Sequence, residues 1–337
     1  MTKGLIGKIF SLFKSDKIIG CPCVFNTLYF DWQNNIRICP KKDNGILIRD
    51  FDGIWLDVQK INQDSKAYLN KFKSGRIDEI CSGCEYLQFG DFKEANVLKE
   101  VVFAHWKNCY LNCKYCNSVK NSNLLDAKHY DIFDAVNQLI DAKKLTTDTR
   151  ITFECGDSLL HPEFNKLLYF FINFESKEII VNTPALVYRE SVADAIAKNA
   201  IKLVVNLDCA NKQIYKNLKG EDSFEIAIEN IKRYIRFQEP DEHRVVSKYT
   251  LYNGINDGKK EISDWYMLCR DLGINELLVD IDENWYLQFG DDVPEYFKEM
   301  LHFIKNISSL DAIDLRFSPK VNKIYLNLNK KNAGKIV

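Results

Sequence analysis

The sequence lacks an excess of charge of either sign. Its 46 lysine and arginine residues are matched by 47 aspartate and glutamate residues, so the formal net charge is −1. Proteins that bind nucleic acid usually carry a basic patch or stripe, so this balance argues against nucleic acid as a partner. The chain also lacks a block of like charges that would indicate an acidic tail.

Segments that would cross or leave a membrane are missing too. No apolar run is long enough to span a bilayer, and the start of the chain does not resemble a cleavable signal. Residues 1–20 predict an amphipathic helix, in which the apolar side chains of residues 3–17 share one side and lysines surround them. Such a helix suits a membrane surface or the protein's own core. We therefore expect a cytoplasmic protein, with contact to the inner face of the membrane through residues 3–17 as a hypothesis.

Cysteine, in contrast, is abundant, with eleven in 337 residues. Eight of them gather in residues 21–39, 81–84 and 109–116. A disulfide framework is typical of small secreted domains, and neither the length nor the start of this chain fits that class. We therefore expect metal binding in a reducing compartment.

From about residue 98, short β-rich runs alternate with segments of helical period. This alternation predicts a parallel sheet with helices outside it, and six units would form an open, partial (β/α)6 barrel of the TIM type. The loops after the strands of such a barrel meet at one face and hold the site. The β-rich runs are "EVVFAHW", "RITFEC", "KEIIVNT", "IKLVVNLDC", "RVVSKYTLY" and "NELLVDID".

The remaining segments do not follow this rhythm. Residues 21–97 predict a separate small cysteine-rich domain before the barrel, which itself covers residues 98–290. Residues 291–337 predict a helix and a strand that cover the substrate side. No low-complexity linker separates these parts.

The stretch "CYLNCKYC" places Cys109, Cys113 and Cys116 directly after the first barrel strand, and no fourth cysteine follows closely. A structural zinc site normally has four ligands, and a ferredoxin motif also has a fourth cysteine. Three thiolates can instead hold three irons of a [4Fe–4S] cluster and leave the fourth iron open for another ligand. Tyr115 would give this cluster an aromatic wall.

This spacing, with an aromatic residue before the third cysteine, resembles the radical S-adenosylmethionine (SAM) superfamily over roughly residues 98–290. The resemblance implies that Cys109, Cys113 and Cys116 ligate a cluster whose open iron binds SAM. It implies that reduction cleaves SAM to a 5′-deoxyadenosyl radical, which abstracts a hydrogen atom from the substrate. It also implies an electron donor such as flavodoxin or ferredoxin.

The stretch "CGDSLLHPEF" resembles the family's Gly-Gly-Glu-Pro segment, which holds the SAM amino group. Cys155 stands at the first glycine position, Gly156 at the second and Asp157 at the glutamate position. Asp157 is one methylene shorter than glutamate, but its carboxylate can still accept a hydrogen bond from an ammonium group.

Later strand ends resemble other SAM-binding segments of the family. Asn182 in "VNTPAL" is retained, and in "VVNLDC" Asn206 replaces a serine while Asp208 is retained. Lys248 on the fifth strand is a candidate partner for the SAM carboxylate. Asparagine and aspartate are also common at strand ends and turns for purely local reasons, which is the alternative for these positions.

The stretches "CPCVFNTLYFDWQNNIRIC" and "GRIDEICSGC" resemble the SPASM and twitch type of auxiliary cluster domain, which usually follows the barrel. The resemblance implies that Cys21, Cys39, Cys81 and Cys84 hold a second [4Fe–4S] cluster, with Cys23 as a spare. Two separated pairs of cysteines would also suit a four-thiolate zinc site.

Three isolated cysteines remain. Cys155 and Cys209 stand at strand ends, where a thiol could return a hydrogen atom to a substrate radical, as an epimerase requires. Free cysteine is also among the most buried residue types, which is the alternative for both. Cys269 shares a helical face with apolar residues, so we expect it in the core.

Several functions therefore stay open. The first is a radical SAM enzyme that oxidises or epimerises a sugar, a glycan or another small substrate. A peptide-modifying maturase is the alternative, although residues 1–97 leave no spare segment for a leader-peptide-binding domain. A non-catalytic iron–sulfur or zinc protein for electron transfer or structure is the third hypothesis, and the absent fourth ligand argues against it.

Overall fold

The computed structural model describes residues 18–32, 35–39, 47–49, 56–82, 84–93, 96–116, 132–289, 294–308 and 313–333. Its centre is a ten-stranded sheet in the order β12-β11-β10-β9-β8-β7-β6-β2-β3-β4. The strands are β2 (Thr27–Asp31), β3 (Ile36–Arg37), β4 (Leu47–Arg49), β6 (Glu100–Ala104), β7 (Arg150–Phe153), β8 (Glu178–Thr183), β9 (Lys202–Asn206), β10 (Val245–Leu251), β11 (Glu276–Ile281) and β12 (Asp314–Phe317).

All six predicted barrel strands are present, as β6 to β11, and neighbouring strands pair in parallel. The parallel run continues at both ends, because β12 pairs in parallel with β11 and β2 pairs in parallel with β6. The prediction of an α/β fold with a parallel sheet is therefore confirmed. The structure differs in extent, since eight parallel strands stand side by side instead of six.

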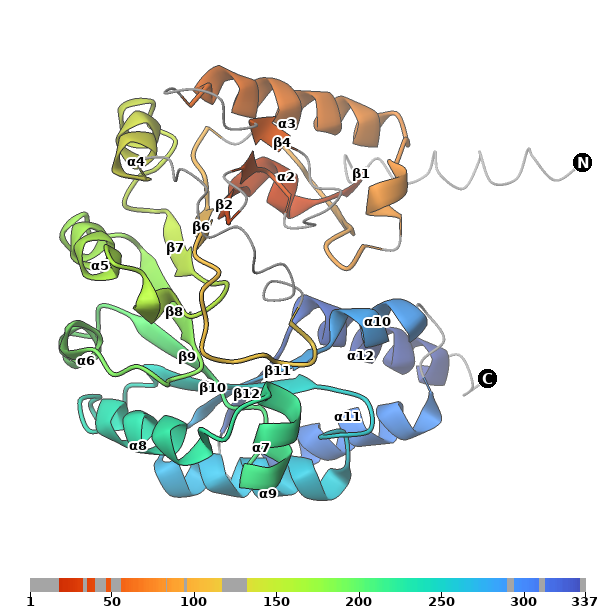
Figure 1. The fold of residues 1–337 in the computed structure, drawn as a ribbon. Helices are drawn as coiled ribbons and strands as arrows, with labels where there is room; N and C mark the ends of the chain where they lie inside the picture. Colours follow the sequence, from red (N-terminus) through yellow and green to blue (C-terminus); the bar gives the residue numbers. More distant parts are fainter. Residues whose placement is uncertain are drawn as a thin grey trace, which may run out of the picture.

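The helices between the strands cover the outer face of the curved sheet (Figure 1). Apolar side chains at helical spacing explain this placement, because each helix buries one stripe against the strands. Phe153 of β7 packs against Phe164 and Phe171, and Tyr249 of β10 packs against Trp265. The helices are α4 (Ile132–Asp141), α5 (Phe164–Asn173), α6 (Glu190–Ala197), α7 (Lys212–Lys219), α8 (Phe224–Ile235), α9 (Lys259–Leu272) and α11 (Glu295–Ser308).

The cysteine-rich N-terminal part shares the barrel's sheet. Strand β2 pairs with β6 from Thr27 to Asp31, and β3 and β4 continue antiparallel beyond it. Phe30 of β2 stacks on Phe103 of β6 with ring centroids 5.1 Å apart. The structure thus differs from the expected separate domain: four of the five β2 residues are buried, and the strand buries them by joining the sheet.

Further elements complete this part. A short antiparallel pair, β1 (Ile18–Gly20) and β5 (Gln88–Gly90), lies beside it. The predicted helical character of residues 3–17 falls outside the described residues. The remaining N-terminal elements are α2 (Pro22–Asn26), α3 (Val58–Lys73) and the short 3-10 helix η1 (Glu79–Cys81).

The C-terminal elements approach the N-terminal part across the open side of the sheet. Helices α10 (Glu283–Phe289) and α12 (Pro319–Ala333) lie across β11 and β12 from α9 and α11 (Figure 1). The Lys323 amine donates to the Cys84 carbonyl at 3.4 Å. The described part of residues 291–337 contains α11, β12 and α12, and that these elements cover a substrate stays a prediction. Among the described helices, none has both the length and the apolar character of a membrane span.

Candidate active site

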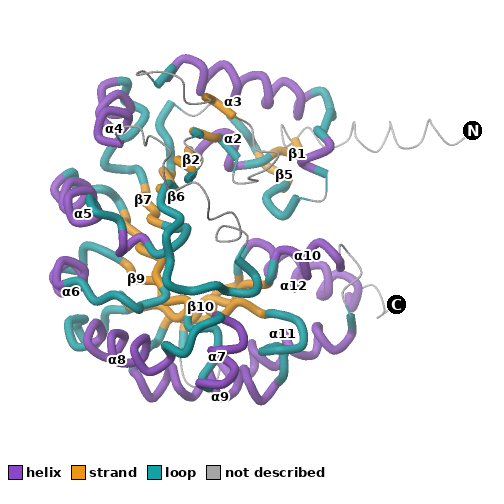
Figure 2. The backbone as a smooth tube through the Cα atoms, viewed as in Figure 1, coloured by secondary structure: helices purple, strands orange, loops and turns teal. Residues whose placement is uncertain are grey.

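Residues 105–116 form an irregular loop that leaves β6 and crosses the mouth of the curved sheet (Figure 2). Cys109, Cys113 and Cys116 are all partly exposed on this loop. The Leu111 amide donates to the Cys109 sulfur at 3.4 Å, and the Cys116 amide donates to the Cys113 carbonyl at 3.0 Å. These contacts make a compact loop of residues 109–116, and that the three thiols ligate one cluster stays a prediction.

The pKa of Cys109 depends on the other two thiols and on the nearby carboxylate of Asp157. Burial, together with the charges of Asp157 and of the other two thiols, raises the pKa of the Cys109 thiol to about 12, although the hydrogen bond from the Leu111 amide lowers it. Thiolates that repel one another in a partly buried loop are stabilised by a bound cation, which the thiol form does not bind. Three thiols are donors of the type found in thiolate metal and cluster sites.

The segment after β7 approaches this loop at van der Waals distance. Gly156 has a φ of +59°, and a Cβ there would lie 2.5 Å from the carbonyl carbon of Lys107. Cys155, just before it, has a φ of +70°, and the Asp157 amide donates to the Asn108 carbonyl at 2.8 Å. Two consecutive left-handed residues turn the chain here, and only glycine fits against the loop backbone.

Asp157 is fully buried at this contact, on the N-terminal side of the 3-10 helix η3 (Ser158–Leu160). Its Oδ1 accepts from the Thr183 hydroxyl at 2.9 Å and from the Leu159 amide at 3.2 Å. Its Oδ2 has no hydrogen-bond partner among the described residues. Burial raises the pKa of this carboxyl to about 6. A buried acceptor without a donor, next to a thiol site, fits a ligand that brings an ammonium group.

Polar side chains line the concave face of the sheet. The register pairs Asn182 with Val204, and Asn206 with Lys248, so these residues share one face. Tyr249 packs outward on α9, which places Lys248 on the opposite, concave face. The Asn182 amide donates to the Phe153 carbonyl at 3.1 Å, and Asn206 Oδ1 has no hydrogen-bond partner in the described structure.

Lys248 already has a protein partner on this face. Its amine lies 3.0 Å from Asp280, which Lys320 also approaches at 3.8 Å. Burial alone would raise the pKa of Asp280, but the two lysines lower it below its usual range. Sequence reasoning missed Asp280, whose only signal was its place at the end of the "LLVD" strand.

Asp208 is placed differently from the residues above, in a closed buried network. Its Oδ1 accepts from the Thr250 amide, and its Oδ2 accepts from the Lys219 amine and from the Tyr115 hydroxyl, the latter at 2.6 Å. Its side chain is 0% exposed. Both oxygens of the carboxylate therefore already have protein donors, and the side chain is fully buried, so that Asp208 contacts SAM stays a prediction. Lys219 was also missed, because a lysine next to glycine normally suggests an exposed helix end.

The two candidate hydrogen donors also differ. Cys209 is 0% exposed, its thiol lies 3.5 Å from the Asn211 carbonyl, and it belongs to the core. Burial raises its pKa to about 12. The structure thus favours the core alternative for Cys209, whereas Cys155 is partly exposed beside the cysteine loop. Cys269 is buried, as expected.

The five N-terminal cysteines form a second group. Cys21 begins helix α2, and a hydrogen bond from the Cys23 thiol lowers its pKa to about 7. Burial raises the pKa of Cys81 to about 11, and the charges of Cys21 and Cys39 add to this effect. The pKa of the Cys23 thiol is raised above its usual range by its hydrogen bond to Cys21, by burial, and by the charges of Cys21, Cys39 and Cys84. The structure therefore brings the four predicted ligands and the spare Cys23 into one neighbourhood.

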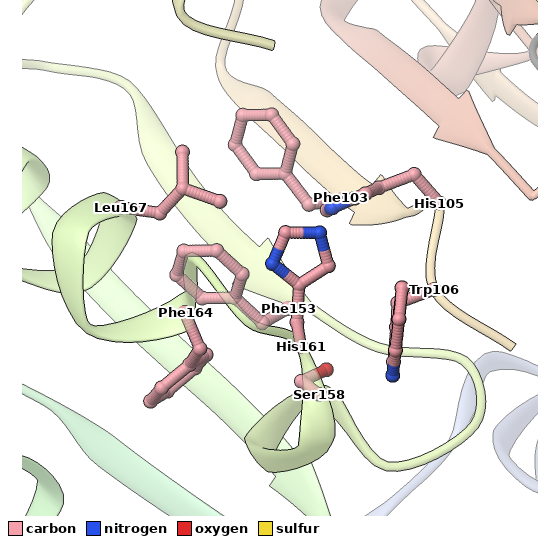
Figure 3. A pocket seen from close by; sticks show the side chains of 8 residues that line it. All are labelled: Phe103, His105, Trp106, Phe153, Ser158, His161, Phe164 and Leu167. Atoms are coloured by element: carbon pink, nitrogen blue, oxygen red, sulfur yellow. The ribbon is translucent and has the colours of Figure 1, made fainter. Parts of the chain in front are cut away.

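No set of three or more His, Cys, Asp or Glu side chains in the described ranges is arranged around a single ion. A small pocket lies at the start of the cysteine loop, lined by His105 and Trp106 of that loop and by Ser158 of η3 (Figure 3). There the His161 ring lies edge-on to His105 and to Trp106, with both centroid distances 4.7 Å. Phe153 of β7 also lines this pocket.

The chain resembles known proteins in part of its sequence and in its fold. Residues 103–266 match the model of the Radical SAM superfamily. No curated protein matches the chain. The SuiB protein of Streptococcus suis, solved with its precursor peptide SuiA, is 12% identical with a TM-score of 0.51, over 77% of this chain and 62% of SuiB. SuiB bound to S-adenosylmethionine is 14% identical with a TM-score of 0.50, over 77% of this chain and 55% of SuiB.

A radical SAM methyltransferase from Sphaerobacter thermophilus is 15% identical with a TM-score of 0.43, over 63% of both chains. At these identities the likeness to SuiB concerns the fold alone. The chain spans less than two thirds of the length of SuiB in either structure.

Proposed function

Because residues 103–266 match the model of the Radical SAM superfamily, we propose that the chain is a radical SAM enzyme that cleaves SAM reductively and abstracts a hydrogen atom from a polar substrate. Members of this family use a [4Fe–4S] cluster and SAM. One observation carries the proposal: three neighbouring thiols lie beside Asp157, whose buried Oδ2 has no partner among the described residues.

The residues of the site fit these cofactors. Cys109, Cys113 and Cys116 would hold three irons, and Asp157 Oδ2 would accept a hydrogen bond from the SAM amino group. When bound, the cluster and SAM together supply the 5′-deoxyadenosyl radical. Gly156 keeps the carboxylate of Asp157 close to the loop, since any side chain at position 156 would push the two apart.

The concave face would position the rest of SAM and the substrate. Asn206 Oδ1 is a buried acceptor that suits a ribose hydroxyl. Asn182 and Lys248 complete the polar lining, and Lys248 would have to exchange Asp280 for a SAM carboxylate in order to bind it. Asp208 is better suited to hold the loop, as its oxygens are saturated.

We further propose that Cys21, Cys39, Cys81 and Cys84 bind a second [4Fe–4S] cluster. Burial raises the pKa of both Tyr29 and Tyr86. The charge of Cys23, from the cysteine group, and the charge of Glu154, at the end of β7, raise both pKa values further. The cysteine group and the barrel interior are thus electrostatic neighbours. A cluster there could accept an electron from a substrate radical, which favours oxidation over epimerisation.

The substrate class is proposed from the polar groups that SAM would leave on this face. Asp280, with Lys320 3.8 Å away, favours a hydrophilic substrate, such as a sugar or glycan. A peptide substrate is the second candidate, because the SuiB fold neighbour was solved with a precursor peptide. A flavodoxin or ferredoxin would supply the electron. Incubation of the reduced enzyme with sugar and peptide libraries, followed by mass spectrometry for a loss of two hydrogens, would distinguish the two classes.

The decisive experiment is anaerobic SAM cleavage. The chain is reconstituted with iron and sulfide, reduced, and assayed for 5′-deoxyadenosine, with and without candidate substrates. We expect product from the wild type and none when Cys109, Cys113 and Cys116 are changed to alanine. An iron-loaded wild type that neither binds nor cleaves SAM would refute the proposal and favour a non-catalytic iron–sulfur or zinc protein.

The second cluster is tested by iron content. Changing Cys21, Cys39, Cys81 and Cys84 to serine should remove about four irons per chain and leave SAM binding intact. If the wild type instead binds one zinc ion at these cysteines, the zinc alternative is correct.

A further inference from the structure

The end of helix α7 is bonded to the cysteine loop along the backbone. The Asn112 amide donates to the Lys219 carbonyl at 2.9 Å, and the Lys114 amide donates to the Leu218 carbonyl at 2.9 Å. Gly220 ends the helix with a φ of +82°, and a Cβ there would lie 2.9 Å from the Asn112 carbonyl oxygen. The middle of the loop, between Cys109 and Cys116, is therefore held against one helix end.

A buried side-chain network adds to this connection. The Lys219 amine donates to the Tyr115 hydroxyl at 2.6 Å and to the Asp208 carboxylate, which Tyr115 also contacts at 2.6 Å. Asp208 is in turn held by strand β10 through the Thr250 amide, and Asn256 donates to its carbonyl at 2.9 Å. The network thus connects the residue before Cys116 to α7 and to two barrel strands.

This network is not an obvious source of stability. The side chains of Lys219 and Asp208 are 1% and 0% exposed. Desolvation of a buried ion pair offsets most of its attraction, so an apolar pair of the same volume is often equally stable. The geometry of the pair is specific, however, since the amine and the carboxylate both require Tyr115 in one place.

We propose that Lys219 is a positioning residue, which through Tyr115 and Asp208 holds the cysteine loop in the conformation that binds the cluster. This inference rests on the proposed function, because it concerns the SAM-binding site.

The test compares Lys219→Met with Lys216→Met in the full, reconstituted chain. Lys216 is on the same helix but is exposed, so its variant controls for the loss of one lysine from α7. The readouts are the rate at which a chelator removes iron, and the change that SAM causes in the EPR spectrum of the reduced cluster. That spectral change reports the triplet cluster specifically, since only its open iron binds SAM.

For Lys219→Met we expect at least tenfold faster iron loss and a diminished or altered SAM-dependent EPR change. Lys219→Arg should recover most of the wild-type behaviour, because it keeps the charge and the donor. Tyr115→Phe removes two hydrogen bonds, the one to Asp208 and the one from Lys219, and should accelerate iron loss at least about fivefold. If circular dichroism shows that Lys219→Met is unfolded, the comparison is made with Tyr115→Phe and Lys219→Arg instead.

The outcomes separate the two proposals. Equal iron loss and equal EPR spectra in Lys219→Met and Lys216→Met would overturn the positioning role while leaving the enzyme proposal intact. A wild-type chain with no SAM-sensitive cluster would refute the proposed function itself. Iron loss that rises in Lys219→Met but not in Tyr115→Phe would overturn the route through Tyr115.

Discussion

Substitution of Gly156 by alanine is the sharpest test of the site geometry, because this glycine has two separate reasons to be glycine. Its φ of +59° is left-handed, which costs a residue with a Cβ about 1–2 kcal/mol. The new Cβ would also meet Lys107 and Asn108, with backbone atoms at 2.5 and 2.7 Å. Forcing a methyl group into such a contact costs about 1–3 kcal/mol. Together these two costs should lower the free energy of unfolding of Gly156→Ala by about 2–5 kcal/mol.

Gly254→Ala is the matched control. Gly254 has a φ of +74°, and a Cβ added there would meet nothing within 4 Å, so it carries only the conformational cost. Urea unfolding of both apo variants should show Gly156→Ala less stable than Gly254→Ala by about 1–3 kcal/mol. Because the clash falls just before Cys109, Gly156→Ala should also lose iron and SAM binding, while Gly254→Ala retains both.

Equal stability of the two variants, together with wild-type iron content in Gly156→Ala, would refute this reasoning. It would mean that the segment after β7 does not contact the cysteine loop as the structure places it. The position of Asp157 beside the triplet depends on that same contact, so its proposed role would be withdrawn as well.

Other predictions concern Asp157 and Cys209. Asp157→Asn should weaken SAM binding at least tenfold in calorimetry without loss of iron, since an amide is a poorer partner for an ammonium group; unchanged affinity would contradict this. The folded pKa of Asp157, about 6, exceeds its ordinary value of 3.8, so the native apo chain keeps a proton that the unfolded chain has released. Its free energy of unfolding should therefore fall as pH rises from about 4 to about 6, by about 3 kcal/mol, and Asp157→Asn should abolish this part of the slope. Cys209→Ala should leave any solvent deuterium incorporation into product unchanged, because the thiol is buried; a loss of incorporation would restore Cys209 as the donor.

The alternation of β-rich and helical segments was sufficient to predict the central barrel. Strands such as β8 and β9 are short apolar runs between amphipathic helices, and such local periodicity is a property of the sequence. The position of β2 was not predictable in the same way. It pairs with β6, which lies about seventy residues later in the sequence, and no local pattern predicts which edge of a sheet a strand will occupy.

The sequence by itself determined that Cys109, Cys113 and Cys116 share one short loop with no fourth cysteine close by, and this spacing predicted the cluster site. Only the tertiary structure decided which polar residues face that loop. Asp157 and Asp208 look alike in the sequence, as acids after strands. In the described part of the chain, one oxygen of Asp157 has no donor, whereas both oxygens of Asp208 accept from Lys219, Tyr115 or Thr250. The physical reason is that burial and hydrogen-bond partners come from residues distant in the chain, which a pattern of neighbouring residues does not contain.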